Sequence, residues 1–354
     1  MLSMESTLTY FIALQGAEKQ LQGELQSYFP AANNLRVSAG LFSTNADIST
    51  SPIVAFCAQA MPAGLFAQEE SISAWAAFIV SRLVETKSIF SENPWRLDIF
   101  DVNFIGKAKQ PRRCQLVEQK VHELLKTKFR SALRKMVSPS EVAPRRLLLI
   151  QLALISPTTG IVSIMTPELA DMYSHCSTPL PYACATIPED KFPPSRAYRK
   201  LLEAELHLGL KIKEHETCVE LGAAPGGWSA IVLARGAKLV ALDRSELRSD
   251  LMRHENLTFI KGDGFKYVPA NTPVDWLLCD MIAFPERSLQ LLEEWLLNGW
   301  CHKFILTFKF KGHEDHILLS QIKAILLKTC SIFKLRHMLN NKNEIMAMGQ
   351  LRTS

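Results

Sequence analysis

The sequence predicts an α/β protein in two parts, an N-terminal α+β region followed by a doubly wound parallel sheet. The first observation is length, because 354 residues are too many for one ordinary hydrophobic core. The second is the alternation of strand-like and helical segments after residue 190. We therefore expect domains at residues 1–165 and 191–354, joined by a proline-rich linker over 166–190. The strand-like runs are "TCVELGA", "AKLVALD", "LTFIKGD", "VDWLLCDM" and "KFILTFKF".

Residues 1–165 lack this alternation, which favours an α+β arrangement. Residues 8–29 predict a strand, a turn at Gly16 and a helix. Further strands are predicted within 51–62, at 94–102 and at 146–156, and further helices at 70–85 and at 115–137. The last of these helices is amphipathic, with an apolar stripe and a basic face.

Positive charge is concentrated in one segment of the chain. Residues 101–150 hold 12 Lys and Arg against four Asp and Glu, a net charge of +8. The whole chain has a net charge of +5, so the remainder carries 5 − 8 = −3. Such a segment is typical of a protein that binds a polyanion such as nucleic acid. The alternative is the solvated face of a helix.

Composition excludes several classes of protein. No apolar run approaches the roughly 18 residues of a transmembrane helix, and the N-terminus lacks the basic region of a signal peptide. The eight cysteines include no C-x-x-C pair, which predicts reduced thiols and a cytoplasmic location. No cluster of metal-ligating residues is visible, so we predict no metal dependence.

The segment "CVELGAAPGGWS" (218–229) predicts a strand, a tight turn and the start of a helix. Its spacing is G-x-x-x-G-G, which disfavours a dinucleotide and favours a smaller ligand with a carboxylate. Asp243 ends the next strand, where a ribose diol is commonly held, and Asp263 ends the third strand. Each aspartate alone could be a loop or cap residue. Together with the glycine-rich turn they predict binding of S-adenosylmethionine.

The segment "LTFKFKG" (306–312) reads as a buried strand that contains lysines. Its alternation places Thr307, Lys309 and Lys311 on one face and the apolar side chains on the other. A buried lysine is costly unless it is paired or deprotonated. Either this is an edge strand with both lysines in water, or Lys309 has a function.

Several motifs resemble the RrmJ/FtsJ-type ribose 2′-O-methyltransferases, in particular those that methylate a cytidine of 23S rRNA. The motifs are "FPPSRAYRKLLEA", "ELGAAPGGWS", "LLCDM", "EEWLLNGWC" and "FKF", within about residues 190–312. The resemblance implies a Rossmann-like S-adenosylmethionine-dependent methyltransferase domain behind a THUMP-like RNA-binding region, acting on 23S rRNA. It implies cofactor contacts at Glu220, Gly222, Ala223, Pro225, Gly226, Gly227, Trp228, Asp243, Asp263 and Asp280. We expect a monomer, although the sequence leaves the oligomeric state open.

The resemblance also implies a Lys-Asp-Lys-Glu catalytic arrangement. "SRAYRK" places the first lysine at Lys200, "CDM" the acid at Asp280, and "FKF" the second lysine at Lys309. "NKNEIMAMG" makes Glu344 the fourth candidate, although it could be a turn residue before a strand.

This arrangement suits the chemistry, because a ribose 2′-hydroxyl must be oriented and must lose its proton. A lysine accepts that proton only if its pKa falls from about 10.4 toward neutrality. Desolvation and a second cation lower a lysine pKa, whereas a carboxylate raises it. We predict that Lys309 is the base, that Asp280 orients it and that Lys200 assists.

Two other functions remain open. A small-molecule or protein methyltransferase on the same fold would need neither the two lysines nor the basic segment. A catalytically inactive RNA-binding homologue would be expected to lack a lysine or Asp280, and all three are present. The segments "LDRSEL" and "KFKGHEDH" depart from the family pattern, so the target nucleotide is open.

Overall fold

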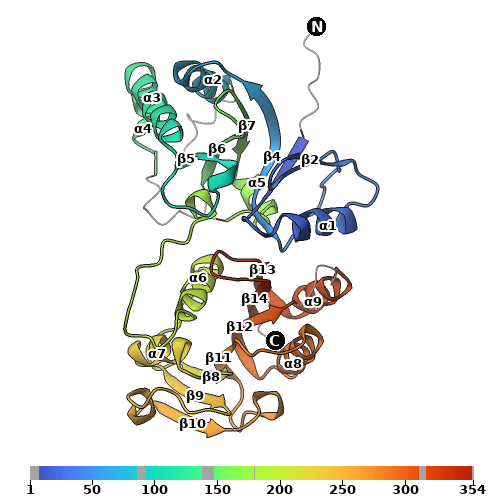
Figure 1. Ribbon diagram of the computed structural model, residues 1–354, viewed down its shortest axis with the longest axis vertical. Helices are drawn as coiled ribbons and strands as arrows, with labels where there is room; N and C mark the ends of the chain where they lie inside the picture. The colour runs from blue at the N-terminus through green and yellow to red at the C-terminus, as the bar shows by residue number, and fades with distance from the viewer. Residues whose placement is uncertain (1–7, 86–92, 138–146, 179, 311–315, 353–354) are drawn as a thin grey trace. The chain divides into compact units, whose positions relative to one another are not determined.

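The computed structural model describes residues 8–85, 93–137, 147–178, 180–310 and 316–352. The chain divides into two compact units, Met1–Ala185 and Thr186–Ser354 (Figure 1). Lys311 and residues 138–146 of the basic segment lie outside the described residues. In the part that is described, no helix is long and apolar enough to cross a membrane.

The N-terminal unit is an α+β structure, as the order of its segments predicts. Its elements are β1 (Leu8–Ala13), α1 (Glu18–Tyr28), β2 (Asn34–Ser38), β3 (Leu41–Thr44), β4 (Cys57–Gln68), α2 (Ile72–Glu85), β5 (Trp95–Asp101), η2 (Val102–Phe104), α3 (Arg112–Lys128), α4 (Arg130–Leu133), β6 (Leu148–Leu154), β7 (Thr159–Met165), α5 (Pro167–Met172) and η3 (Pro181–Ala183).

The strands of this unit form a seven-stranded sheet among the described residues, in the order β2-β3-β1-β4-β7-β6-β5. Only the β5–β6 pair is parallel. Helices α2 and α3 pack on one face of β5, β6 and β7, where their apolar stripes form a core with Trp75 and Trp95. The segment expected to be a linker includes α5 and η3, which contact strands of this sheet.

The basic helix expected over 115–137 is interrupted at Phe129. This residue leaves helical geometry, with φ −141° and ψ 50°, and separates α3 from α4. Phe129 and Leu133 are partly buried against the core, and Ala132 is buried within it. The break therefore turns the end of the helix toward the core, which helical periodicity alone did not indicate.

The C-terminal unit alternates strands and helices, as predicted. Its elements are α6 (Tyr198–Leu208), β8 (Thr217–Leu221), α7 (Gly227–Ala234), β9 (Lys238–Asp243), η4 (Leu251–Arg253), β10 (Leu257–Lys261), η5 (Gly264–Lys266), β11 (Val274–Cys279), α8 (Pro285–Leu297), β12 (Cys301–Lys309), α9 (His316–Thr329), β13 (Cys330–Arg336) and β14 (Glu344–Leu351).

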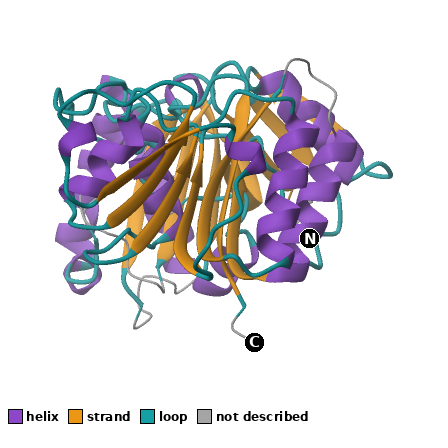
Figure 2. Ribbon diagram, turned by 90° about the horizontal axis from the view of Figure 1, so that it is seen from below, coloured by secondary structure: helices purple, strands orange, loops and turns teal. Residues whose placement is uncertain are grey.

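The strand order of this sheet is β10-β9-β8-β11-β12-β14-β13. Strands β10, β9, β8, β11 and β12 are mutually parallel. Helices α6 and α7 cover one face, and α8 and α9 the other (Figures 1 and 2). The order reverses between β8 and β11, and ligands of doubly wound sheets bind outside the carboxyl ends of strands at such a point.

The sheet is mixed rather than wholly parallel as expected. Strand β14 inserts between β12 and β13 and runs antiparallel to both. Its connection to β13 spans only residues 337–343, which is too short for the crossover that a parallel pair requires. This insertion sets Glu344, the first residue of β14, opposite Lys309, the last residue of β12.

Candidate active site

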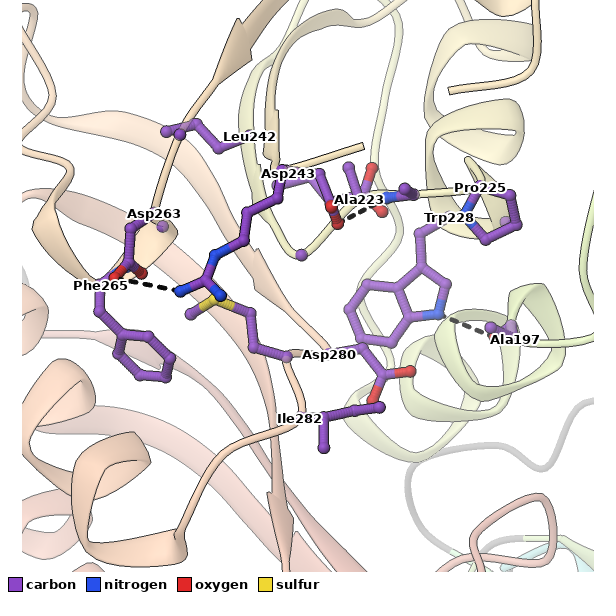
Figure 3. A pocket seen from close by; sticks show the side chains of 18 of the residues that line it. Ala197, Ala223, Pro225, Trp228, Leu242, Asp243, Asp263, Phe265, Asp280 and Ile282 are labelled. Carbon is purple, nitrogen blue, oxygen red and sulfur yellow. Dashed lines mark hydrogen bonds and ion pairs between the residues drawn. The ribbon is translucent and has the colours of Figure 1, made fainter. Parts of the chain in front are cut away.

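A cavity of about 450 Å³ opens at the carboxyl edge of the C-terminal sheet, where the strand order reverses (Figure 3). Its walls come from the turn between β8 and α7, the ends of β9, β11 and β12, and the start of η5. This is the position expected for the ligand of a doubly wound sheet. Every residue predicted from the sequence to contact a cofactor lines it except Gly226, which lies in the same turn.

The glycine-rich turn adopts a backbone that requires glycine. Gly222 has φ +80° and Gly226 has φ +108°, in the left-handed region that other residues rarely adopt. A Cβ on Gly222 would lie 2.5 Å from Cγ of Met281, and one on Gly226 would lie 2.5 Å from Cδ1 of Leu251. The turn therefore packs closely against neighbouring segments and brings its backbone to the wall of the cavity.

Two acidic side chains, Glu220 and Asp243, line the cavity next to this turn. Glu220 is buried and accepts a hydrogen bond of 2.6 Å from Oγ of Ser229. Burial raises the pKa of Glu220 to about 8, with smaller contributions from nearby Asp280 and Asp243. Asp243 accepts hydrogen bonds of 3.0 Å from the backbone N–H groups of Ala224 and Ser245. The Ala224 bond ties the end of β9 to the glycine-rich turn.

Asp263 is held by a second set of contacts on the far side of the cavity (Figure 3). One oxygen accepts from the backbone N–H of Phe265 at 3.1 Å, and the other pairs with Arg287 at 3.2 Å and with Arg244 at 3.7 Å. The guanidinium of Arg287 also stacks over the Phe265 ring, 3.9 Å from its centre. Sequence reasoning missed both arginines, because nothing in the spacing of the strands signals them.

Trp228 joins the cofactor turn to helix α6. Its side chain is buried, and its Nε1 donates a 2.8 Å hydrogen bond to the carbonyl of Ala197, the residue before α6. Figure 3 shows this indole beside Ala223 and Pro225 at one wall of the cavity. The contact fixes where α6 begins and therefore where Lys200 lies.

The four residues predicted to be catalytic come together from four different elements. Lys200 projects from α6, Asp280 follows β11, Lys309 ends β12 and Glu344 begins β14. Nζ of Lys200 lies 3.2 Å from Oδ2 of Asp280 and 2.5 Å from Oε1 of Glu344. Nζ of Lys309 lies 3.1 Å from Oδ1 of Asp280 and donates to the Asp280 carbonyl at 2.9 Å. Of the four, Asp280 and Lys309 line the cavity.

The two lysines differ in their surroundings. Lys200 lies between two carboxylates, and only 15% of its side chain is exposed. Burial acts to lower its pKa, but Asp280 and Glu344 outweigh burial and the pKa of Lys200 is raised. Lys309 is 23% exposed and pairs with Asp280. Lys200 is therefore held as an ammonium ion away from the cavity, while Lys309 lines the cavity.

The N-terminal unit carries an exposed basic surface on and around α3 and α4. Among the described residues, the exposed cations of this surface are Lys107, Lys109, Arg112, Lys126, Lys128, Arg130, Arg134 and Lys135. The apolar stripe of α3 faces the core with Val117, Val121 and Leu125. Its opposite face is therefore free to carry charge in solvent.

Comparison with known proteins shows what the C-terminal unit is similar to. Residues 193–319 match the FtsJ-like methyltransferase family. This range begins before α6 and ends within α9, so it includes the glycine-rich turn, Lys200, Asp280 and Lys309.

Three relatives carry the name ribosomal RNA large subunit methyltransferase M. The Shewanella amazonensis protein is 35% identical over 185 residues, covering 48% of this chain and 51% of the relative. The Haemophilus influenzae protein is 30% identical over 216 residues, covering 52% and 60%. The Yersinia pestis protein is 36% identical over 156 residues, covering 40% and 42%. The chain thus spans about half the length of these relatives.

A solved structure with a partial likeness is the 1,6-didemethyltoxoflavin-N1-methyltransferase of Burkholderia thailandensis. It has a TM-score of 0.33 and 15% identity, covering 46% of this chain and 80% of that one. The family likeness predicted from the sequence motifs is confirmed by the family match and by the relatives. Residues 193–319 of the C-terminal unit are therefore the part of the chain that resembles the FtsJ-like methyltransferases.

Proposed function

We propose that this protein is an S-adenosylmethionine-dependent RNA ribose 2′-O-methyltransferase that acts on a cytidine of 23S rRNA. The observation that carries the proposal is the convergence of Lys200, Asp280, Lys309 and Glu344 beside the cavity. The names of the relatives support ribosomal RNA as the substrate. The basic surface of the N-terminal unit supports a polyanionic partner.

The cavity has the chemistry that S-adenosylmethionine requires. The cofactor carries a cationic sulfur, a cationic amino group and a ribose diol. Glu220 and Asp243 line one side of the cavity, and neither has a cationic partner in the described part of the chain. An ionised carboxylate also offers about four acceptor sites, so Asp243 keeps capacity for a diol beyond its two backbone bonds.

We assign residues to the parts of the cofactor by position. The backbone of residues 222–227 and the start of α7 would hold the amino-acid end, because free N–H groups at a helix start favour a carboxylate. Asp243 would hold the ribose of the cofactor, and Asp263 with Phe265 would face its adenine. Ala223, Pro225 and Trp228 would form the wall beside the amino-acid end.

When bound, S-adenosylmethionine supplies a methyl group on a cationic sulfur. The residues of this chain must then place a ribose 2′-hydroxyl and remove its proton. We assign proton acceptance to Nζ of Lys309, because Lys309 lines the cavity whereas Lys200 does not and has a raised pKa. Asp280 contacts Nζ of both lysines through its two oxygens, and Glu344 holds Lys200 from the other side.

The N-terminal unit is proposed to bind structured RNA through its phosphates. Its exposed cations lie on a helical surface, where they reach phosphates without reading base sequence. Such contacts position an RNA on a protein, and the acceptor nucleotide is then selected at the C-terminal unit. Residues 1–165 are in this proposal a THUMP-like RNA-binding region, joined through 166–190 to a methyltransferase domain at 191–354.

Methyl transfer to defined RNA tests the proposal. The protein would be incubated with labelled S-adenosylmethionine and unmodified 23S rRNA made by transcription. We expect label in RNA at a cytidine, at a linkage that resists alkaline hydrolysis because the 2′-oxygen is blocked. A matched RNA with a 2′-deoxy residue at that position should take up no label.

Three results would count against parts of the proposal. Label on a base would contradict ribose chemistry, and label on a nucleotide other than cytidine would contradict the proposed target. Absence of label in RNA, with undiminished binding of S-adenosylmethionine, would favour a small-molecule or protein substrate.

A further inference from the structure

Glu203 is a buried acid that the proposed chemistry does not use. It lies on α6 three residues after Lys200, and only 1% of its surface is exposed. Residues three apart on a helix project from the same face, so Glu203 and Lys200 point toward the same neighbours. A buried carboxylate is costly unless it is fully hydrogen bonded, so its partners indicate its purpose.

His207, one turn further along α6, lies 3.7 Å from Oε1 of Glu203, and the closer partners of Glu203 belong to the loop that precedes Glu344. Oε1 accepts from the backbone N–H of Leu339 at 2.7 Å. Oε2 accepts from the backbone N–H of Asn340 at 3.0 Å and from its side-chain Nδ2 at 2.7 Å. Three donors from two successive residues thus converge on one carboxylate. Glu203 fixes the backbone of this loop at its middle.

The loop leads directly into Glu344. It spans residues 337–343 between β13 and β14, and Glu344 follows as the first residue of β14. His337 donates from Nδ1 to the Glu344 carbonyl at 2.8 Å, and Asn341 donates to the same oxygen at 3.3 Å. The loop is therefore held at Glu203 and closes on the backbone of Glu344.

Helix α6 thus attaches to this region at two points. Lys200 contacts the Glu344 side chain, and Glu203 contacts the loop five and four residues before it. Burial acts to raise the pKa of Glu203, but hydrogen bonds from His207, Asn340 and Leu339 outweigh burial and the pKa is lowered. Glu203 is ionised at neutral pH and holds the loop with a full negative charge.

We propose that Glu203 is a positioning residue, which sets the Glu344 carboxylate against Lys200 by anchoring the loop that enters β14. The effect on methyl transfer rests on the proposed function, because it assumes that Glu344 serves that reaction. The effect on the Lys200–Glu344 ion pair does not depend on the reaction.

Glu205 offers a matched control on the same helix. It is also buried, accepts from the backbone N–H of Ile212 at 2.9 Å and pairs with Arg235. These partners lie in the segment after α6 and at the end of α7. In the described part of the chain, neither contacts Glu344. Glu205→Gln therefore removes a comparable buried charge without touching the loop.

Glu203→Gln and Glu205→Gln would be compared in the full-length protein. Glutamine has one acceptor oxygen and one NH₂ group in place of the two carboxylate oxygens. In Glu203→Gln, this NH₂ group therefore faces an N–H donor of the loop that has lost its acceptor. We expect single-turnover methylation to fall roughly 10- to 100-fold in Glu203→Gln, the scale expected when a buried N–H donor loses its acceptor. Affinity for S-adenosylmethionine should change less than about twofold, and Glu205→Gln should keep near wild-type transfer.

A double-mutant cycle shows whether Glu203 acts through Glu344. In a Glu344→Gln background, Glu203→Gln should cause little further loss, because residues in one network are not additive. The side-chain ammonium signal of Lys200 in ¹⁵N NMR spectra, assigned by its absence in Lys200→Arg, provides a readout without RNA. That signal should change in Glu203→Gln and stay in place in Glu205→Gln. Should Glu203→Gln fail to fold, Asn340→Ala removes one of the three hydrogen bonds and should change the signal in the same direction.

Two outcomes would overturn the inference. One is a Lys200 signal in Glu203→Gln that matches wild type. The other is a loss of activity that adds in full to that of Glu344→Gln, which would make Glu203 a general support of the fold. A wild-type protein that transfers no methyl group to RNA would instead refute the proposed function, and the Lys200 signal would still decide the positioning role.

Discussion

Lys200 and Glu344, which are far apart in the chain, form an ion pair in which Nζ lies 2.5 Å from Oε1. Asp280 approaches the same ammonium at 3.2 Å. Two carboxylates stabilise the charged form of Lys200, and its pKa is raised although burial opposes this. Lys200 is thereby suited to act as a fixed cation. This leaves Lys309 as the lysine that faces the cavity and could accept a proton.

Substitution of Lys309 tests its role as a base. Lys309→Ala should lower single-turnover methylation by roughly 10²–10⁴, the usual contribution of a general base. Lys309→Arg should be nearly as poor, because arginine keeps the charge but cannot release its proton in a protein. Affinity for S-adenosylmethionine, measured by calorimetry, should stay close to wild type.

Lys200→Arg is the comparison for that experiment. A fixed cation can be replaced by another cation, so Lys200→Arg should retain more activity than Lys309→Arg. If Lys309→Arg were fully active with an unchanged fold, Lys309 would be an electrostatic or positioning residue and the assignment of the base would be wrong.

Loss of the Asp243 carboxylate should weaken binding of the cofactor. Asp243→Ala should cost about 1–3 kcal/mol in affinity for S-adenosylmethionine, the scale of hydrogen bonds to a charged group. Asp250→Ala removes an exposed acid of the same unit, paired with Arg248, and should leave affinity unchanged. Undiminished affinity in Asp243→Ala, measured by calorimetry, would remove this residue from the site.

Binding of the cofactor should be linked to the ionisation of Glu220. Burial raises the pKa of Glu220 to about 8, so below that pH the free protein carries mostly the protonated acid. A cation bound beside it favours the carboxylate and lowers that pKa. Binding at pH 7 should therefore release a proton, and affinity should rise from pH 6 to about pH 8 and then level off.

Calorimetry in buffers of different ionisation enthalpy measures this proton release. Glu220→Gln keeps a hydrogen-bonding partner for Ser229 but cannot ionise, so its affinity should depend less on pH in the same interval. The expectation fails if Glu220→Gln releases the same number of protons as wild type.

Charge reversal on the basic surface tests the role of the N-terminal unit. Lys126, Arg130 and Arg134 are exposed on and beside α3 and α4, and changing all three to Glu should weaken RNA binding. If each contacts one phosphate, the slope of log affinity against log salt should fall by about two to three units. Fluorescence anisotropy at several salt concentrations measures both quantities, and affinity for S-adenosylmethionine should not change.

A control triple substitution carries the same change in charge. Lys19, Arg36 and Arg82 lie elsewhere in the N-terminal unit, and reversing them should affect RNA binding much less. An equal loss in both variants would indicate that only net charge matters. An unchanged affinity and slope in the first variant would make the basic segment a solvated helix face.

Features that depend on local pattern could be predicted from the sequence alone. The apolar run and glycines of residues 217–227 indicated a strand followed by a tight turn, and both are present. The period of two in residues 306–310 predicted the strand that ends at Lys309. These predictions succeeded because local structure follows from the spacing of apolar side chains and the positions of glycines within the same short segment.

Contacts between residues on different strands of the sheet could not be predicted in this way, because they depend on the packed fold. No local pattern in the sequence predicts that β14 inserts between β12 and β13. This insertion sets Glu344 opposite Lys309 and within reach of Lys200. Helical period likewise gave no sign that Phe129 would leave helical geometry between α3 and α4. The pairing of Glu203 with residues 339 and 340 is a further case. Each depends on burying apolar surface from segments distant in sequence, and that free energy exists only once those segments are packed together.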